Sequence, residues 1–207
     1  MTWPTALPLV AILRGITPAE AEAHARVLLA AGFDAIEVPT NSPDWAESVR
    51  RIVALAPSAW VGAGTVLDGA HLDALEASGG RLAVSPHTDV ALIAESVRRG
   101  LCALPGALTP SEVFAAARAG ATAVKIFPAA SLGPSHVKAM RAVLPPALPL
   151  LAVGGVGPGN LADYLDAGCA GAGLGGELYR AGQAPDVTAR QARAFVEAWR
   201  RHQDAAR

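Results

Sequence analysis

The sequence has few cysteines and no recognisable metal-binding motif. Its two cysteines, Cys102 and Cys169, both lie in apolar segments. We therefore expect two small buried thiols in a reducing environment rather than a disulfide. The chain contains no Cys-x-x-Cys, His-x-His or His-Glu-x-x-His pattern, and its five histidines are scattered. We accordingly expect neither a metal nor any other cofactor.

The sequence also lacks the patterns of membrane and nucleic-acid proteins. No apolar run reaches the roughly 18 residues that suggest a membrane span. Residues 1–8 carry no basic region of the kind that opens a signal peptide. The formal net charge is −1 and charges of both signs are interspersed, which argues against a basic nucleic-acid surface. We expect a cytoplasmic protein that acts on a small molecule.

What is present is a regular alternation of short apolar runs and alanine-rich amphipathic segments, repeating every 22 to 28 residues or so. The apolar runs are Leu9–Leu13, Ala35–Val38, Trp60–Ala63, Leu82–Val84, Leu101–Leu104, Ala123–Ile126, Pro149–Val153 and Ala170–Leu174. Eight strand–helix units predict an α/β fold, a (βα)8 barrel that forms one domain over residues 1–207. An open doubly wound sheet is the alternative, but eight regular units favour closure.

Proline and glycine mark where the intervening helices should begin and end. Expected starts are Thr17-Pro18, Ser42-Pro43, Thr109-Pro110, Gly133-Pro134 and Gly157-Pro158, because proline is favourable in the first helical turn. Expected ends are Gly32, Gly100, Gly120 and Gly168, because glycine accepts the left-handed C-cap conformation. A last helix is expected from about 187 to 202, with Ala192, Phe195, Val196 and Trp199 on one face.

One lysine stands inside a strand-like segment. Lys125, in Val124-Lys125-Ile126, is one of two lysines in a chain that otherwise uses arginine. Burial lowers the pKa of a lysine and leaves a neutral amine that attacks carbonyls. The alternative is a lysine at the strand end whose amine reaches solvent.

A carboxylate is expected to face this lysine. In Ala35-Ile36-Glu37-Val38 the bulky residues suit the helix side, so Glu37 should point into the barrel, and the same alternation points Lys125 inward. Active sites of these barrels lie at the C-terminal ends of the strands. The pair therefore predicts a Schiff-base lysine beside an acid/base carboxylate. A purely structural buried ion pair is the competing interpretation.

Other strand ends offer groups for binding anions. Arg14 ends the first strand and could hold a substrate carboxylate, and Thr65 adds a hydroxyl after Gly62-Ala63-Gly64. Gly154-Gly155 and Gly175-Gly176 follow the seventh and eighth strands, the usual phosphate site of these barrels. Taken together, these residues predict a lyase that acts on a phosphorylated keto acid.

These motifs resemble the 2-keto-3-deoxy-6-phosphogluconate aldolase family over roughly residues 9–182. The matching segments are Ile12-Leu13-Arg14-Gly15, Ile36-Glu37-Val38, Val61–Val66, Ser85-Pro86, Val124–Pro128 and Val153–Val156. The phosphogalactonate branch fits best, because Asn41 and Val153 stand where the phosphogluconate enzymes typically carry Arg and Thr. Loss of the Thr hydroxyl removes a partner for one configuration of a sugar hydroxyl, which offers a basis for choosing the C4 epimer. A galactonate-degrading pathway is implied by the same resemblance.

The resemblance implies metal-free class I chemistry, a homotrimer, and cleavage to pyruvate and glyceraldehyde 3-phosphate. It makes Lys125 the imine-forming residue and Glu37 the proton shuttle. It implies that Arg14, Thr65 and Pro86 bind the pyruvate half of the substrate. It implies that the phosphate is bound by Gly154, Gly155, Gly175, Gly176 and Ser131. Gly176 replaces the usual Ser, which removes a hydroxyl from the phosphate loop.

Two alternatives remain. A phosphogluconate or 4-hydroxy-2-oxoglutarate aldolase would use the same lysine on another substrate. A phosphate-binding barrel without aldolase chemistry, or a phosphoribosyl isomerase, would bind phosphate and form no imine.

Overall fold

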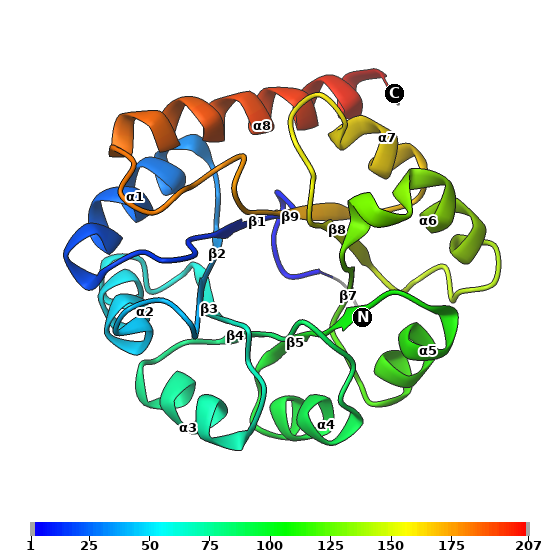
Figure 1. The fold of residues 1–207 in the computed structure, drawn as a ribbon, viewed down its shortest axis with the longest axis horizontal. Helices are drawn as coiled ribbons and strands as arrows, with labels where there is room; N and C mark the ends of the chain where they lie inside the picture. Colours follow the sequence, from blue (N-terminus) through cyan, green and yellow to red (C-terminus); the bar gives the residue numbers. More distant parts are fainter. Residues whose placement is uncertain (1–2, 206–207) are drawn as a thin grey trace.

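The computed structural model describes residues 3–205 as a barrel of parallel strands surrounded by helices (Figure 1). The strands are β1 (Leu9–Ile12), β2 (Ala35–Pro39), β3 (Trp60–Gly64), β4 (Leu82–Val84), β5 (Cys102–Leu104), β6 (Gly106–Ala107), β7 (Val124–Ile126), β8 (Leu150–Val153) and β9 (Gly171–Leu174). The helices are α1 (Pro18–Ala31), α2 (Trp45–Leu55), α3 (Gly69–Ala77), α4 (Val90–Arg98), α5 (Pro110–Arg118), the 3-10 turn η1 (Ala129–Ser131), α6 (Gly133–Arg141), α7 (Leu161–Asp166) and α8 (Pro185–Ala205).

The predicted (βα)8 barrel is confirmed, with one difference at its fifth strand. The strand order is β5-β4-β3-β2-β1-β9-β8-β7-β6, and all the pairs are parallel. Only Pro105 separates β5 from β6, so the chain itself joins the two ends of this order. The expected fifth strand, Leu101–Leu104, is present as β5 and ends before Pro105, which has no N–H to donate to a ladder; β6, which follows Pro105, is a short strand that the apolar runs do not predict. The alternative of an open doubly wound sheet is therefore wrong.

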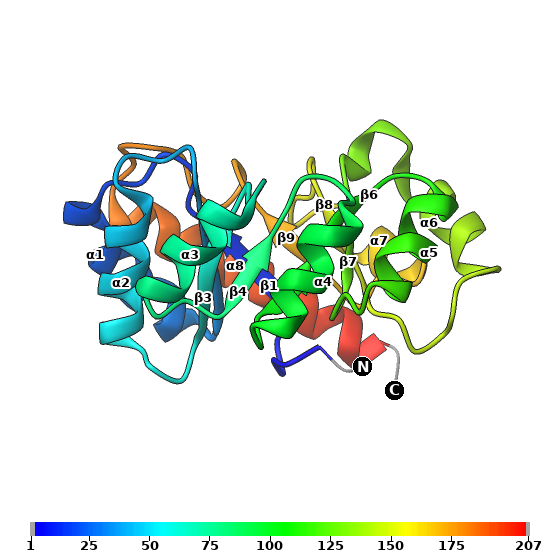
Figure 2. The ribbon, with the colours of Figure 1, turned by 90° about the horizontal axis from the view of Figure 1, so that it is seen from below.

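The strands separate two groups of buried side chains. Val10, Ala35, Ala123 and Leu151 belong to a small cluster with residues of β4 and β5, against which Trp3 and Trp60 pack. Their strand neighbours instead join the large cluster shared with the helices. Most of the first group stands at or next to the first residues of the strands, at the end of the barrel where the segment before β1 passes in the side view (Figure 2). The next inward positions along these strands therefore face the other mouth.

Helix boundaries follow the local signals in most places. α1, α5 and α6 begin at the expected Pro or Gly, and Gly32 has φ 102° at the end of α1. Two expected starts are wrong, because α2 and α7 begin a few residues after Pro43 and Pro158, which lie in turns. α8 extends slightly beyond both expected ends. None of the helices in residues 3–205 is long and apolar enough to cross a membrane.

Candidate active site

A cavity of about 320 Å³ opens at the mouth formed by the C-terminal ends of the strands. The inward positions that follow the buried interior cluster line it, namely Ile12 of β1, Glu37 of β2, Lys125 of β7 and Val153 of β8. Each of these lies two residues beyond a member of that cluster. The alternation of side chains along a strand thus places an amine and a carboxylate in the same cavity.

Lys125 is buried although its side chain carries an amine. It is 6% exposed between Val124 and Ile126, which pack on the helix side. Its Nζ lies 4.9 Å from the centre of the Phe127 ring. Burial lowers the pKa of Lys125 from its usual value; the Glu37 carboxylate opposes this shift and Arg14 adds to it. A lysine in this setting has a larger fraction of neutral amine than one in water.

Glu37 is also buried, at 3% exposed. Burial raises the pKa of its carboxyl group, while Lys125 and Arg14 oppose the shift. Its Oε2 atom has no hydrogen-bond partner within the described chain. A Cβ placed on Gly64 would lie 2.8 Å from the carboxylate atoms, so the glycine of β3 makes room for this group. A buried carboxylate with a free oxygen can receive or return a proton.

The two groups face one cavity without touching each other. Within residues 3–205, no hydrogen bond and no ion pair shorter than 4.0 Å joins Glu37 to Lys125, although they influence each other's pKa. A structural ion pair would have its charged atoms in contact, because the attraction must offset the cost of burial. Their charged atoms are instead more than 4.0 Å apart, and both side chains line the same cavity.

Arg14 supplies a second cation at the mouth. It follows β1 and lines the cavity, and its Nη1 donates a 2.7 Å hydrogen bond to Oδ1 of Asn41. The backbone N–H of Gly15 donates to Oγ of Ser42 at 2.9 Å. The Asn41-Ser42 turn therefore holds the loop after β1, and Asn41 reaches the cavity through Arg14 rather than by lining it.

Thr65 lies on the wall in a strained backbone conformation. Its φ is 56°, a value that β-branched residues rarely adopt. Its carbonyl accepts a 2.7 Å hydrogen bond from Oγ1 of Thr40, the residue after β2. Strain of this kind persists where neighbouring structure holds it, and it concentrates at binding sites.

Backbone from two glycine loops forms the remaining wall. Gly154 and Gly155, after β8, both have positive φ, and a Cβ on Gly155 would lie 2.4 Å from Cβ of Ala130. Gly175 and Gly176, after β9, also line the cavity. Glycine lets the chain pass close to a ligand and exposes its N–H groups to an anion.

Most of the predicted site residues line the cavity. These are Arg14, Glu37, Thr65, Pro86, Lys125, Val153, Gly154, Gly155, Gly175 and Gly176. Ser131 does not: it is exposed in η1, whose Ala130 donates a 3.0 Å backbone hydrogen bond to Gly154.

Five further residues line the cavity without having been predicted as site residues, namely Ile12, Phe127, Val156, Gly173 and Glu177. The alternation of side chains along a strand predicts that Ile12 and Gly173 face the inside of the barrel. Phe127 lies two residues after Lys125, on the same side of the chain. Nothing in the sequence pattern points to Glu177, which is exposed in the loop after β9.

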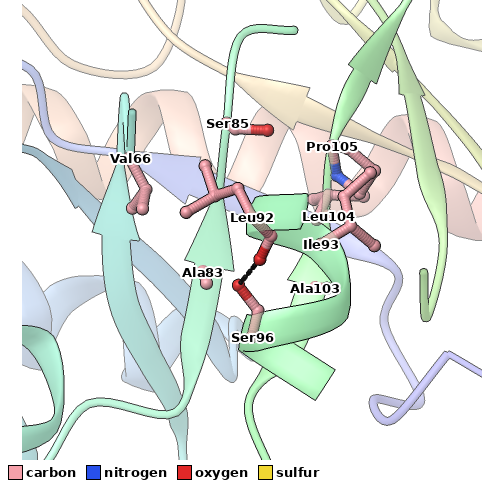
Figure 3. A pocket seen from close by; sticks show the side chains of 9 residues that line it. All are labelled: Val66, Ala83, Ser85, Leu92, Ile93, Ser96, Ala103, Leu104 and Pro105. Carbon is pink, nitrogen blue, oxygen red and sulfur yellow. Dashed lines mark hydrogen bonds between the residues drawn. The ribbon is translucent and has the colours of Figure 1, made fainter. Parts of the chain in front are cut away.

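A second hollow lies between β4, β5 and α4 (Figure 3). Its volume is about 10 Å³, room for a single water at most, and no charged side chain lines it. Within it Oγ of Ser96 donates to the carbonyl of Leu92 at 2.8 Å, a bond internal to α4. This hollow is a packing gap and offers no chemistry.

Comparison with known proteins places the chain among aldolases. The family model described as KDPG and KHG aldolase matches residues 4–192. The 2-dehydro-3-deoxy-6-phosphogalactonate aldolase of Escherichia coli strain K12 is 53% identical over 97% of this chain and 98% of its own. The 2-dehydro-3-deoxy-phosphogluconate aldolase of Pseudomonas aeruginosa PAO1 is 34% identical over 77% of this chain and 71% of its own.

A solved structure shares the whole fold. The structure described as native KDPGal is 52% identical, covers 99% of this chain and 100% of its own, and superimposes with a TM-score of 0.96. The strand ends that carry the cavity therefore belong to a fold already known from a relative of similar length.

Proposed function

The chain belongs to the family of KDPG and KHG aldolases, and on that premise we propose that it cleaves 2-dehydro-3-deoxy-6-phospho-D-galactonate to pyruvate and D-glyceraldehyde 3-phosphate. The observation that carries the proposal is the cavity shared by a buried amine and a buried carboxylate that do not touch. Class I chemistry needs these two groups with space for a ketone between them.

Lys125 is the proposed nucleophile. Its neutral amine attacks the C2 ketone, and loss of water gives an iminium ion. The C3–C4 bond then breaks as its electron pair moves into the iminium, which becomes an enamine, and the C4 hydroxyl loses its proton. Protonation of the enamine at C3 and hydrolysis release pyruvate and restore the amine.

Glu37 is the proposed proton shuttle. It takes the C4 hydroxyl proton through a bridging water and serves in imine formation and hydrolysis. Burial raises the pKa of this carboxyl group, which suits a group that must both accept and return a proton.

The two ends of the substrate would meet different walls. Arg14, Thr65 and Pro86 would hold the pyruvate half, with Arg14 paired to the carboxylate. The backbone N–H groups of the two glycine loops would hold phosphate. A role for Ser131 in phosphate binding stays a prediction, since it lies outside the cavity.

The preference for the galactonate epimer is supported at two levels. The chain is 53% identical to a phosphogalactonate aldolase and 34% identical to a phosphogluconate aldolase. Val153 lines the cavity without offering a hydroxyl, and Asn41 holds Arg14. A hydroxyl missing from the wall removes a partner for one configuration at C4.

The test is pyruvate release, coupled to lactate dehydrogenase, from the two phosphorylated C4 epimers side by side. We expect a higher kcat/KM for the galactonate epimer. Val153→Thr adds a hydroxyl at nearly constant volume and should shift the ratio toward the gluconate epimer about tenfold. Equal turnover by the wild type, together with an unchanged ratio in the variant, would favour the broader phosphogluconate or hydroxyglutarate aldolase.

We further propose a cytoplasmic homotrimer, supported by the resemblance of the chain to this family. Light scattering after size-exclusion chromatography should give about three times the 21.0 kDa chain mass. A mass of one or two chains at micromolar concentration would contradict the trimer.

A further inference from the structure

A polar cluster is buried between α1, α8 and the loop that joins β9 to α8. His24 of α1 is 1% exposed and Thr188 of α8 is fully buried. Nδ1 of His24 and Oγ1 of Thr188 lie 2.8 Å apart in a hydrogen bond. Nε2 of Gln183, in the loop, donates to the same hydroxyl at 2.7 Å. Buried polar groups are costly unless paired, so the cluster holds these three segments in one arrangement.

The cluster continues along the loop toward the cavity. Gln183 donates to the carbonyl of Leu178 at 3.0 Å and accepts from the N–H of Arg180 at 3.1 Å. The ring of Tyr179 meets the ring of His24 edge to face, with centres 4.9 Å apart. Residues 178–183 are thus anchored on the buried histidine and threonine.

The anchored half of the loop leads directly to the glycines of the cavity wall. The carbonyl of Gly175 accepts hydrogen bonds from the N–H groups of Leu178 and Tyr179, at 2.8 and 2.9 Å. Gly175 and Gly176 have no side chains, and a Cβ at either would meet nothing within 4 Å. Nε of Arg180 donates to the carbonyl of Gly176 at 3.0 Å, so both glycines are bonded to the anchored residues that follow them, and their orientation depends on those residues.

We propose that His24 is a positioning residue which, through Thr188, Gln183 and Tyr179, orients the Gly175-Gly176 backbone for the phosphate of the substrate. The inference rests on the proposed function, because it takes these glycines as part of the phosphate site. His24 lies outside the cavity and contacts no reacting atom. Its loss should weaken phosphate binding and leave the chemistry at Lys125 intact.

The experiment compares His24→Leu and Thr188→Val with Thr188→Ser, which keeps the hydroxyl. His202→Leu is the matched control, since His202 also lies in a helix but bonds to Asp166 at the surface. Three quantities are measured for each protein: KM and kcat for the phosphorylated substrate, the dissociation constant for inorganic phosphate, and exchange of the pyruvate methyl protons in D2O. The exchange needs the Lys125 imine but no phosphate.

We expect His24→Leu and Thr188→Val to raise KM and the phosphate dissociation constant about tenfold, the equivalent of one broken hydrogen bond to a buried group. Pyruvate exchange should stay within about twofold of wild type, as it should in the two other variants. The serine variant tests the hydroxyl even where His24→Leu fails to fold.

Unchanged KM and phosphate affinity in the valine variant would overturn the proposal, as would an equal loss of pyruvate exchange, which indicates general structural damage. Absence of aldolase chemistry looks different, because the wild type would then exchange no pyruvate protons, and a different C4 preference would appear only in the comparison of the two epimers. Weaker phosphate binding by the valine variant would still support the positioning role of the cluster in that case.

Discussion

At the scale of single residues, the site depends on burying two groups that water would normally keep charged. Lys125 and Glu37 influence each other across the cavity, yet burial has the largest effect on the pKa of each. The amine becomes easier to deprotonate and the carboxyl easier to protonate. The shift at Lys125 favours the neutral amine that imine formation requires, and the shift at Glu37 favours a carboxyl group that can hold and return a proton.

Removing the charge of Glu37 should therefore move the pKa of Lys125. The carboxylate raises that pKa, so Glu37→Gln is expected to lower it further. The measurement is the rate of borohydride trapping at low pyruvate concentration as a function of pH. The rising limb of this pH profile should shift to lower pH, whatever the maximal rate of the variant. Glu47→Gln, at a surface carboxylate paired with Arg50, should leave the limb in place. A rising limb that is unchanged or moves to higher pH would contradict the coupling between Glu37 and Lys125.

Lys125→Ala is expected to abolish the trappable pyruvate adduct, because no other buried amine faces the cavity among its lining residues. Mass spectrometry after borohydride treatment measures the adduct. Lys138→Ala, at the only other lysine, which is exposed on α6, is the matched control. An adduct that survives in Lys125→Ala would remove the lysine from its proposed role and favour a non-aldolase barrel.

Gly64 is expected to be essential for the position of Glu37. A methyl group there would lie 2.8 Å from the carboxylate, and the carboxylate would have to move. We expect Gly64→Ala to lower kcat/KM roughly 10- to 100-fold, as small displacements of catalytic groups do. Gly69→Ala, where the added atom meets nothing within 4 Å, should leave kcat/KM unchanged. Full activity of Gly64→Ala would show that the carboxylate has more freedom than its contacts indicate.

At the scale of elements, the strands position the catalytic side chains and the helix caps stabilise the surrounding helices. α5 begins with a capping box, in which the N–H of Thr109 donates to Oε2 of Glu112 at 2.8 Å and the N–H of Glu112 donates back to Oγ1 of Thr109 at 3.3 Å. The box satisfies two N–H groups that the helix itself leaves unpaired. It lies outside the cavity, so it affects stability without touching the chemistry.

Thr109→Ala should lower the free energy of unfolding by about 1 kcal/mol, the usual loss for an N-cap. Urea denaturation measures the change, and the kcat of the folded variant should match wild type. Ser111→Ala, at an exposed position in the same turn, is the control and should be close to neutral. A loss of activity at unchanged stability would show that the capping box of α5 also affects the active site.

At the scale of the whole molecule, the barrel closes where its first and last strands meet. β1 pairs with β9, and on the outside α8 packs against α1 and α7 (Figure 1). Phe195 of α8 is fully buried in the large cluster. The last helix therefore covers the closing strands, and the loop before it carries part of the cavity.

Phe195→Ala should cost about 3–5 kcal/mol of unfolding free energy, because it removes a large side chain from a closed part of the core. Chemical denaturation is the measurement, and Arg193→Ala, exposed on the same helix, should stay within about 0.5 kcal/mol of wild type. A small effect at Phe195 would mean that α8 is not needed to hold the barrel closed.

The sequence by itself determined which residues form strands and which of their faces point inward, because the two-residue period of a strand is local. Lys125 and Glu37 could be placed on the inward face for that reason. The prolines and the short strands are less predictable: Pro43 and Pro158 lie in turns before their helices rather than inside them, and no apolar run marks β6, which follows Pro105.

Only the tertiary structure decided how far apart the inward groups lie and what supports them. The gap between Lys125 and Glu37 depends on closure of the barrel, which no local pattern reports. Glu177 joins the wall because the loop after β9 lines the cavity. His24 bonds to a residue 164 positions away, on a helix that packs against its own. Contacts of this kind depend on the whole path of the chain, so they become visible only when the chain is folded.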